Sequence, residues 1–165
     1  MEEHRRAGLR AARTKLMDWV KALRGSAVAI DTAPFIYFIE NNPAFIRLVA
    51  PFFEGLDGGE FRAVTSTITL TEVLVHPLRQ DNQALAARYF HILTTSRNLA
   101  VLPVSDAIAS EAAALRAKHG YKTPDAIQIA TGLIGGASSF LTNDAGLGSI
   151  PGMRSVVLDL LRTAP

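Results

Sequence analysis

Residues 27–40, AVAIDTAPFIYFIE, decide the fold that this sequence predicts. The first four are apolar and partly β-branched, and they are bounded by Gly25-Ser26 and by the segment from Asp31 to Pro34. That pattern is typical of a short buried strand followed at once by a helix, with Asp31 at the end of the strand. A strand that leads directly into a helix is the repeating unit of folds built on a parallel sheet.

The same alternation continues along the rest of the chain. Further strands are predicted at 62–66, 99–104, 138–141 and 155–158. Helical periodicity follows Thr69 and recurs at 81–95, 106–119 and 123–133. The pattern predicts an α/β fold with a mostly parallel central sheet of four to five strands, and we find no internal repeat.

A basic amphipathic helix is predicted in residues 1–25, ahead of the first strand. Its apolar stripe is formed by Leu9, Ala12, Leu16, Trp19 and Leu23, and Gly25 ends it. The segment holds seven of the 17 Lys and Arg residues but three of the 15 acids. Such charge can attract RNA phosphates, although a solvated helix face is the commoner explanation. We expect this helix to dock on residues 26–165. Alternatively, residues 1–16 are an addition to a chain whose ordinary start is Met17.

Composition limits the chemistry that this chain can perform. With 165 residues, 48% of them hydrophobic, it is sized for one compact domain with a substantial core. The absence of cysteine excludes disulfides, thiolate metal sites and cysteine nucleophiles. No apolar run approaches the roughly 20 residues that span a bilayer. We therefore expect a cytoplasmic protein without a membrane association.

Four acids stand at predicted strand ends or helix starts: Asp31, Glu72, Asp125 and Asp144. Because the carboxyl ends of parallel strands meet at one edge of a sheet, we expect the four to share one anionic pocket. Each also has a local explanation as a helix cap or turn residue. Glu72, for example, is expected in the first turn of its helix, three residues after Thr69, which is the spacing of a capping box.

A pocket of this kind predicts metal-dependent phosphodiester hydrolysis. Neighbouring carboxylates raise one another's pKa, and a hard divalent cation such as Mg²⁺ or Mn²⁺ relieves the repulsion. The ion polarises a phosphoryl oxygen and activates water, so that no protein nucleophile is needed. Rival motifs are missing: there is no G-x-S-x-G, and the glycine-rich stretches lack a phosphate-loop lysine. The number of metal ions stays open.

The chain resembles the PIN domain family and, within it, the VapC toxins of bacterial toxin–antitoxin pairs. The resemblance extends over about 28–161 and rests on four motifs in the family's order: AIDTAPFIYFIE (29–40), TSTITLTEVLVHPLR (65–79), TPDAIQIATGLIGGA (123–137) and FLTNDAGLGSIPGM (140–153). It implies a three-layer α/β/α fold, a homodimer, RNA as the substrate and neutralisation by a small cognate antitoxin.

The resemblance also implies roles for single residues. The catalytic and metal-holding acids would be Asp31, Glu72, Asp125 and Asp144, with Mg²⁺ or Mn²⁺ as cofactor. The residues that support these acids or touch the substrate would be Thr32, Thr142 and Asn143. The resulting prediction is an endoribonuclease toxin. Two alternatives stay open: a catalytically silent PIN-like module that binds RNA or protein, and a PIN nuclease of RNA maturation or DNA processing.

Overall fold

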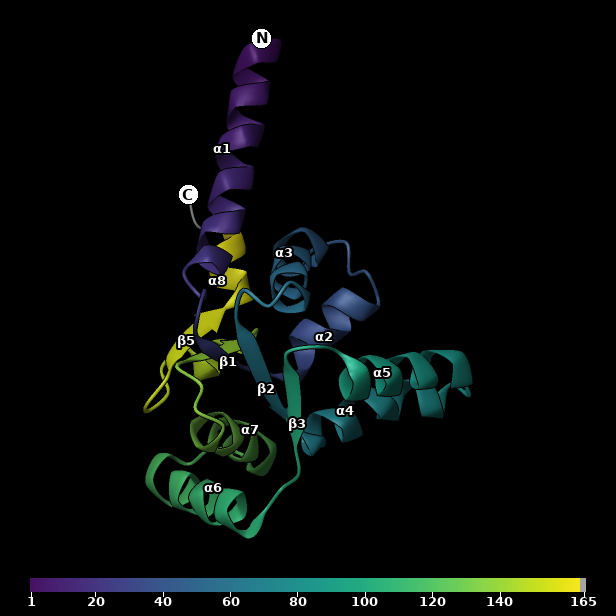
Figure 1. Ribbon diagram of the computed structural model, residues 1–165, viewed down its shortest axis with the longest axis vertical. Coiled ribbons are helices and arrows are strands. Elements are labelled where there is room, and N and C mark those ends of the chain that lie inside the picture. Colours follow the sequence, from purple (N-terminus) through teal and green to yellow (C-terminus); the bar gives the residue numbers. More distant parts are fainter. Residues whose placement is uncertain (164–165) are drawn as a thin grey trace.

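One five-stranded sheet organises the chain in the computed structural model, which describes residues 1–163 except the side chains of 9–13, 15, 16 and 163 (Figure 1). The strands are β1 (Ala27–Ile30), β2 (Arg62–Ser66), β3 (Leu99–Leu102), β4 (Ser139–Thr142) and β5 (Arg154–Val157). They run parallel in the order β3-β2-β1-β4-β5. The predicted α/β class and parallel sheet are confirmed, including the fifth strand.

Helices connect the strands. They are α1 (Glu2–Lys21), α2 (Thr32–Ile39), α3 (Ile46–Asp57), α4 (Thr67–Arg79), α5 (Gln83–Thr95), α6 (Asp106–His119), α7 (Thr123–Ile134) and α8 (Leu158–Thr163), with a 3₁₀ turn, η1, at Ala145–Leu147. The sequence patterns predict neither α3 nor α8. Helix α3 contains Pro51, a residue that usually interrupts helices, and α8 is too short to show a period.

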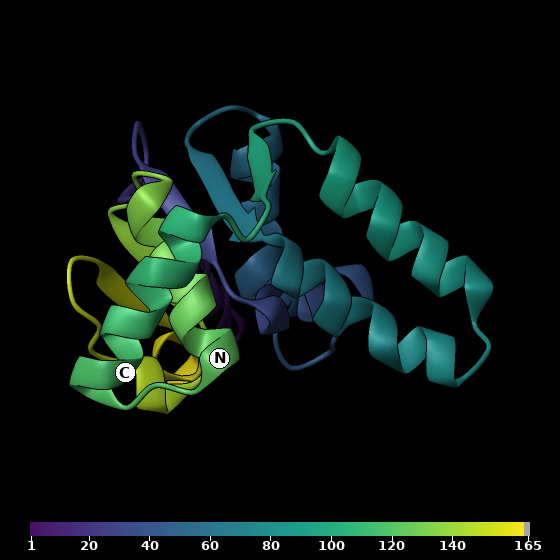
Figure 2. The same ribbon diagram turned by 90° about the horizontal axis from the view of Figure 1, so that it is seen from below.

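The sheet is covered by helices on both faces, as the three-layer prediction requires. Along β1, Val28 and Ile30 join one buried cluster and Ala29 joins the other. The first cluster includes side chains of α2, α3, α5 and α8, and the second those of α6 and α7. Figures 1 and 2 show α6 and α7 together on one side, while α4 and α5 extend from the sheet as an antiparallel pair.

The strand order reverses beside β1. This strand pairs with β2 on one side and with β4 on the other, so the order of winding reverses between β1 and β4. The backbone N–H of Asp31 donates to the carbonyl of Leu141 at 2.9 Å, which aligns the two strand ends. Ligands of open parallel sheets bind at such a reversal, outside the carboxyl ends of the strands.

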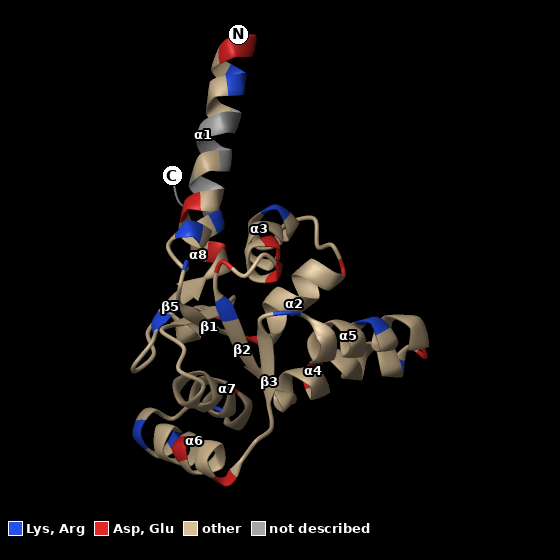
Figure 3. Cartoon of the chain, viewed as in Figure 1, with Lys and Arg blue, Asp and Glu red and all other residues tan. Residues whose placement is uncertain are grey.

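Helix α1 projects from the body and meets it at its C-terminal end (Figure 1). Trp19, Val20 and Leu23 are buried, whereas Met1–Gly8 are exposed, so docking is confirmed for the base of the helix. The predicted stripe positions Leu9, Ala12 and Leu16 lie outside the described side chains. Both ends of α1 carry acidic as well as basic residues (Figure 3), and Arg6 pairs with Glu2 and Lys21 with Asp18. Among the described helices, none is long and apolar enough to cross a membrane.

Candidate active site

The structure brings the predicted acids to the carboxyl edge of the sheet. Asp31 follows β1 and Asp144 lies two residues after β4, while Asp125 and Glu72 belong to α7 and α4. Their charges act on one another: those of Asp31 and Asp144 raise the pKa of Asp125, and those of Asp31 and Asp125 raise the pKa of Glu72. Acids distant in the chain therefore lie within range of one another's charge.

Asp31 is held by hydrogen bonds at both carboxylate oxygens. Its Oδ1 accepts from the backbone N–H of Thr32 at 2.7 Å, and its Oδ2 accepts from Thr142 Oγ1 at 2.7 Å. The first bond caps α2, and the second ties the cap to β4. Burial raises the pKa of Asp31, the two hydrogen bonds oppose that effect, and the charge of Asp144 adds to it.

Glu72 is not in the first turn of its helix, so that prediction is wrong. Helix α4 begins at Thr67, and its cap is Ser66, whose hydroxyl accepts from the N–H of Ile68 at 3.1 Å. A capping box between Thr69 and Glu72 is thereby excluded. Instead, Glu72 Oε2 accepts a short hydrogen bond from Thr32 Oγ1. Burial is the largest cause of the raised pKa of Glu72, and the Thr32 bond opposes it.

Asp125 lies in the first turn of α7, as predicted. No described residue forms a hydrogen bond with its carboxylate, and the charge of Lys122 acts to lower its pKa. Burial, followed by the charges of Asp31 and Asp144, raises that pKa. Asp125 is therefore the acid whose charge the protein compensates least.

Asp144 is exposed and starts the turn η1. Its Oδ1 accepts from the N–H of Gly146 at 2.8 Å, so the local explanation as a turn residue is correct for this oxygen. Its backbone N–H donates to Thr142 Oγ1 at 3.0 Å. Because Thr142 donates in turn to Asp31, one hydroxyl links the ends of β1 and β4.

Of the three polar residues predicted to support the acids, two donate hydrogen bonds to an acid and the third binds other parts of the protein. Thr32 and Thr142 each donate to an acid, to Glu72 and Asp31 respectively. The amide of Asn143 donates to Tyr37 Oη at 3.0 Å and accepts from the backbone N–H of Asp159 at 2.8 Å. Both ends of this amide thus bind the protein, which ties the loop after β4 to α2 and α8.

Three buried polar residues behind the acids are absent from the sequence prediction. Thr65, Thr69 and Gln128 are at most 3% exposed and are joined by hydrogen bonds. A signal exists for Gln128, because it interrupts the buried face of α7 between Ala126 and Ile129. Amphipathic periodicity alone does not reveal the network, since its other members lie on β2 and α4.

The donor chemistry of the site fits a hydrated divalent cation. Among residues 1–163, no three acidic or histidine side chains converge closely enough to hold a metal ion in common. Mg²⁺, however, is usually held by one or two carboxylates and retains several waters. All candidate donors are oxygens, and the raised pKa values of Asp31, Glu72 and Asp125 indicate a charge that a cation would stabilise. Direct ligation by all four acids stays a prediction.

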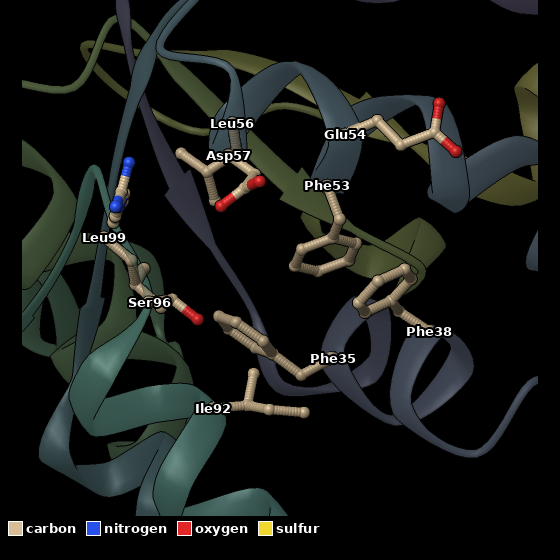
Figure 4. Close-up of a pocket in the computed structure, with 10 residues that line it drawn as sticks. Phe35, Phe38, Phe53, Glu54, Leu56, Asp57, Ile92, Ser96 and Leu99 are labelled. Atoms are coloured by element: carbon tan, nitrogen blue, oxygen red, sulfur yellow. The ribbon is translucent and has the colours of Figure 1, made fainter.

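A separate apolar pocket of about 300 Å³ lies between α2, α3 and the end of α5. Figure 4 shows the rings of Phe35, Phe38 and Phe53 facing into it, with Asp57 nearby. None of the four acids lines this pocket. Its aromatic lining suits an apolar group and not a phosphodiester, so it is distinct from the candidate active site.

Comparisons with known proteins give a family and a fold. A protein-family model described as the PIN domain matches residues 28–152. No curated protein matches the chain. A toxin–antitoxin complex from Klebsiella pneumoniae is similar in structure, with a TM-score of 0.60 and 24% identity over 80% of this chain and 97% of that one. VapBC2 from Rickettsia felis, bound to a DNA fragment from their promoter, has a TM-score of 0.64 and 15% identity over 79% and 98%.

Proposed function

This chain belongs to the PIN domain family, and from that premise we propose that it is a metal-dependent endoribonuclease that hydrolyses RNA phosphodiester bonds. The observation that carries the proposal is that Asp31, Glu72 and Asp125 lie at the carboxyl edge of the sheet within range of one another's charge: burial is the largest cause of the raised pKa values of Glu72 and Asp125, and the charge of Asp31 adds to both. Residues 26–165 form the nuclease domain in this proposal, and residues 1–25 are an added docking element.

The proposed mechanism uses water as the nucleophile. Asp31, Glu72, Asp125 and Asp144 would hold Mg²⁺ or Mn²⁺, and the ion would polarise a phosphoryl oxygen and lower the pKa of water. The chain's own contribution is orientation: Thr32 and Thr142 restrain Asp31, and Thr32 also restrains Glu72. In this proposal Asp144 orients a water beside the phosphate, which its exposure to solvent would allow.

We propose further that the protein acts as the toxin of a toxin–antitoxin pair. Two structurally similar proteins come from toxin–antitoxin complexes, and this chain covers 97% and 98% of the matched chains in them. Their low identity to this chain supports a common fold, so the small antitoxin partner is inferred by analogy. The predicted homodimer rests on the resemblance to the family alone.

Cleavage of a labelled RNA panel by the purified protein tests the enzymatic proposal. We expect cleavage with Mg²⁺ or Mn²⁺ that EDTA stops. Asp31→Asn should lower kcat by about 100-fold or more, a loss typical of removing one preorganised electrostatic group. Asp81→Asn is the matched control, because Asp81 is exposed in the α4–α5 turn and has a backbone φ of 53° that asparagine tolerates. It should cleave like the wild type.

Other outcomes separate the alternatives. Metal binding without cleavage of any nucleic acid would favour the silent binding module, and cleavage of DNA alone would replace RNA as the substrate. For the cellular role, expression should arrest growth, and co-expression of the neighbouring small reading frame should relieve the arrest. Normal growth of cells that contain soluble, active protein would contradict the toxin role and favour RNA maturation.

A further inference from the structure

A buried hydrogen-bond network lies behind the acids and connects α7 to α4 and β2. Gln128 Nε2 is 2.6 Å from Thr69 Oγ1, and Thr69 Oγ1 is 2.7 Å from Thr65 Oγ1. Thr65 Oγ1 in turn donates to the carbonyl of Ile30 at 2.8 Å, immediately before Asp31. The three side chains are at most 3% exposed, so each polar atom needs a partner within the protein.

The direction of these bonds follows from counting protons. The single proton of the Thr65 hydroxyl is given to Ile30, so Thr69 must donate its own proton to Thr65. Thr69 Oγ1 can then only accept at its contact with Gln128. The group of Gln128 that faces it must therefore be the NH₂, because the amide oxygen has no proton to give.

A second branch leads from Gln128 to the candidate active site. Thr32 gives its proton to Glu72, so it too can only accept at its longer contact with Gln128 Nε2, at 3.5 Å. The two protons of one NH₂ group thus serve both branches. If the amide were reversed, its oxygen would face the hydroxyls of Thr69 and Thr32. Both have already donated their protons, so neither contact could be a hydrogen bond.

We propose that Gln128 is a positioning residue for this site: by donating to Thr69 and Thr32, it directs the Thr32 hydroxyl towards Glu72 and fixes the place of that carboxylate. No contact joins Gln128 to Glu72, so its action passes through Thr32. An apolar side chain would be the simpler occupant of this buried helix face, which elsewhere presents Ala126 and Ala130. The inference rests on the proposed nuclease function.

The test compares Gln128→Met with a matched control on the same helix. Methionine keeps the length of the side chain and removes both donors. Thr131→Val is the control, because Thr131 is 1% exposed and its hydroxyl donates within α7, to the carbonyl of Ile127 at 2.7 Å. Both variants lose buried hydrogen bonds, and both should unfold at lower urea concentration than the wild type.

The site measurements should separate the two variants. We expect Gln128→Met to lower Mn²⁺ affinity, measured by titration calorimetry, and kcat on RNA by about 10- to 100-fold, the usual effect of losing a group that orients a metal ligand. KM for RNA should change little, and Thr131→Val should leave all three quantities at wild-type values. In a double-mutant cycle, Gln128→Met should cause no further loss of Mn²⁺ affinity or kcat in a protein that already carries Thr32→Val, because both substitutions act through the Thr32 hydroxyl.

Wild-type Mn²⁺ affinity and kcat in Gln128→Met, or additive losses in the cycle, would overturn the inference. Should Gln128→Met not fold, Thr69→Val, which removes the anchor of the amide, replaces it. Its Mn²⁺ affinity should fall, and Thr69→Ser, which keeps the hydroxyl, should restore it.

The inference and the proposed function can fail separately. A wild-type protein that neither binds Mn²⁺ nor cleaves nucleic acid contradicts the proposed function. In that case crystal structures of the metal-free wild type and Gln128→Met decide the inference alone. A displaced Glu72 carboxylate supports it, and an unmoved one overturns it.

Discussion

Asp31 and Asp144 each perform two tasks that, from sequence, look like alternatives. Asp31 caps α2 through one oxygen and accepts from Thr142 through the other, while Asp144 caps η1 and contributes its charge to the acidic group. A local cap orients a carboxylate at a helix start, and in a parallel sheet the helix starts lie at the ligand-binding edge. The capping bonds therefore help to build the site.

Asp125 is the acid whose removal should stabilise the metal-free protein. Its folded-state pKa is raised above the ordinary value of 3.8, so its ionisation lowers stability as the pH rises through the raised pKa. Asp125→Asn removes that loss without breaking a hydrogen bond. At pH 7 we expect a melting temperature higher by roughly 1–3 °C, allowing for solvent screening of a partly exposed group.

The pH dependence checks the cause. Below pH 3.8 Asp125 is protonated in both states, and the melting temperatures of Asp125→Asn and the wild type should coincide there. The exposed-site control Asp81→Asn should show no comparable gain at pH 7. A variant less stable than the wild type at pH 7 would mean that the Asp125 charge is compensated in the protein.

Metal binding should raise the melting temperature of the wild-type protein. An ion that binds the folded state alone adds about 2.7 kcal/mol at 100 times its dissociation constant. For a domain of this size that corresponds to a rise of roughly 5–10 °C in the melting temperature of the wild type. In a thermal-shift titration with Mn²⁺, Asp31→Asn should show little rise and Asp81→Asn a full one. Equal shifts in all three proteins would place the ion elsewhere.

At the scale of elements, α7 matters because it carries both Asp125 and Gln128 and packs closely on the sheet. A Cβ atom at Gly132 would lie 2.7 Å from the Cβ of Ala29 and 3.0 Å from the Sδ of Met153. Ala29 belongs to β1, which leads directly to Asp31. The missing side chain at Gly132 thus sets the distance between two elements that supply site residues.

Gly132→Ala should destabilise the protein by about 1–3 kcal/mol, because overpacking against a strand outweighs the better helix propensity of alanine. Urea unfolding measures the change. Gly8→Ala is the matched control, since among the described atoms none beyond its chain neighbours and its own helix backbone lies within 4 Å of a Cβ there. That variant should be as stable as the wild type or slightly more stable. Equal effects of the two substitutions would show that α7 can move outward without cost.

At the scale of the whole molecule, α1 divides into a docked base and a projecting remainder. Its base contributes Trp19, Val20 and Leu23 to the same core cluster as β1, and the Trp19 ring stacks on Phe52 at 5.8 Å between centroids. The helix leads into the N-terminal end of β1, whereas Asp31 follows the opposite end. The structure therefore keeps this element away from the acids.

Truncation should separate the two parts of α1. A chain beginning at Met17 should retain nearly the full free energy of unfolding in urea and the full rate of RNA cleavage. A chain beginning at Ser26 loses three buried side chains and should be less stable by roughly 5 kcal/mol, at about 1.5–3 kcal/mol for each. A large loss of stability in the chain beginning at Met17 would show that the distal helix also supports the fold.

Residues close together in the chain determined most of what could be predicted. The βα unit at 27–39, the cap at Asp31, the start of α7 near Asp125 and the four acids follow from short patterns, because caps, turns and periodicity depend on neighbours within a few residues. Tertiary structure alone decided that β4 lies beside β1, that α3 forms despite Pro51, and that Glu72 meets Thr32 from the second turn of α4. It also decided the role of Gln128, whose partners lie 59 and 96 residues away. Those features depend on contacts that exist only after the sheet has brought distant segments together.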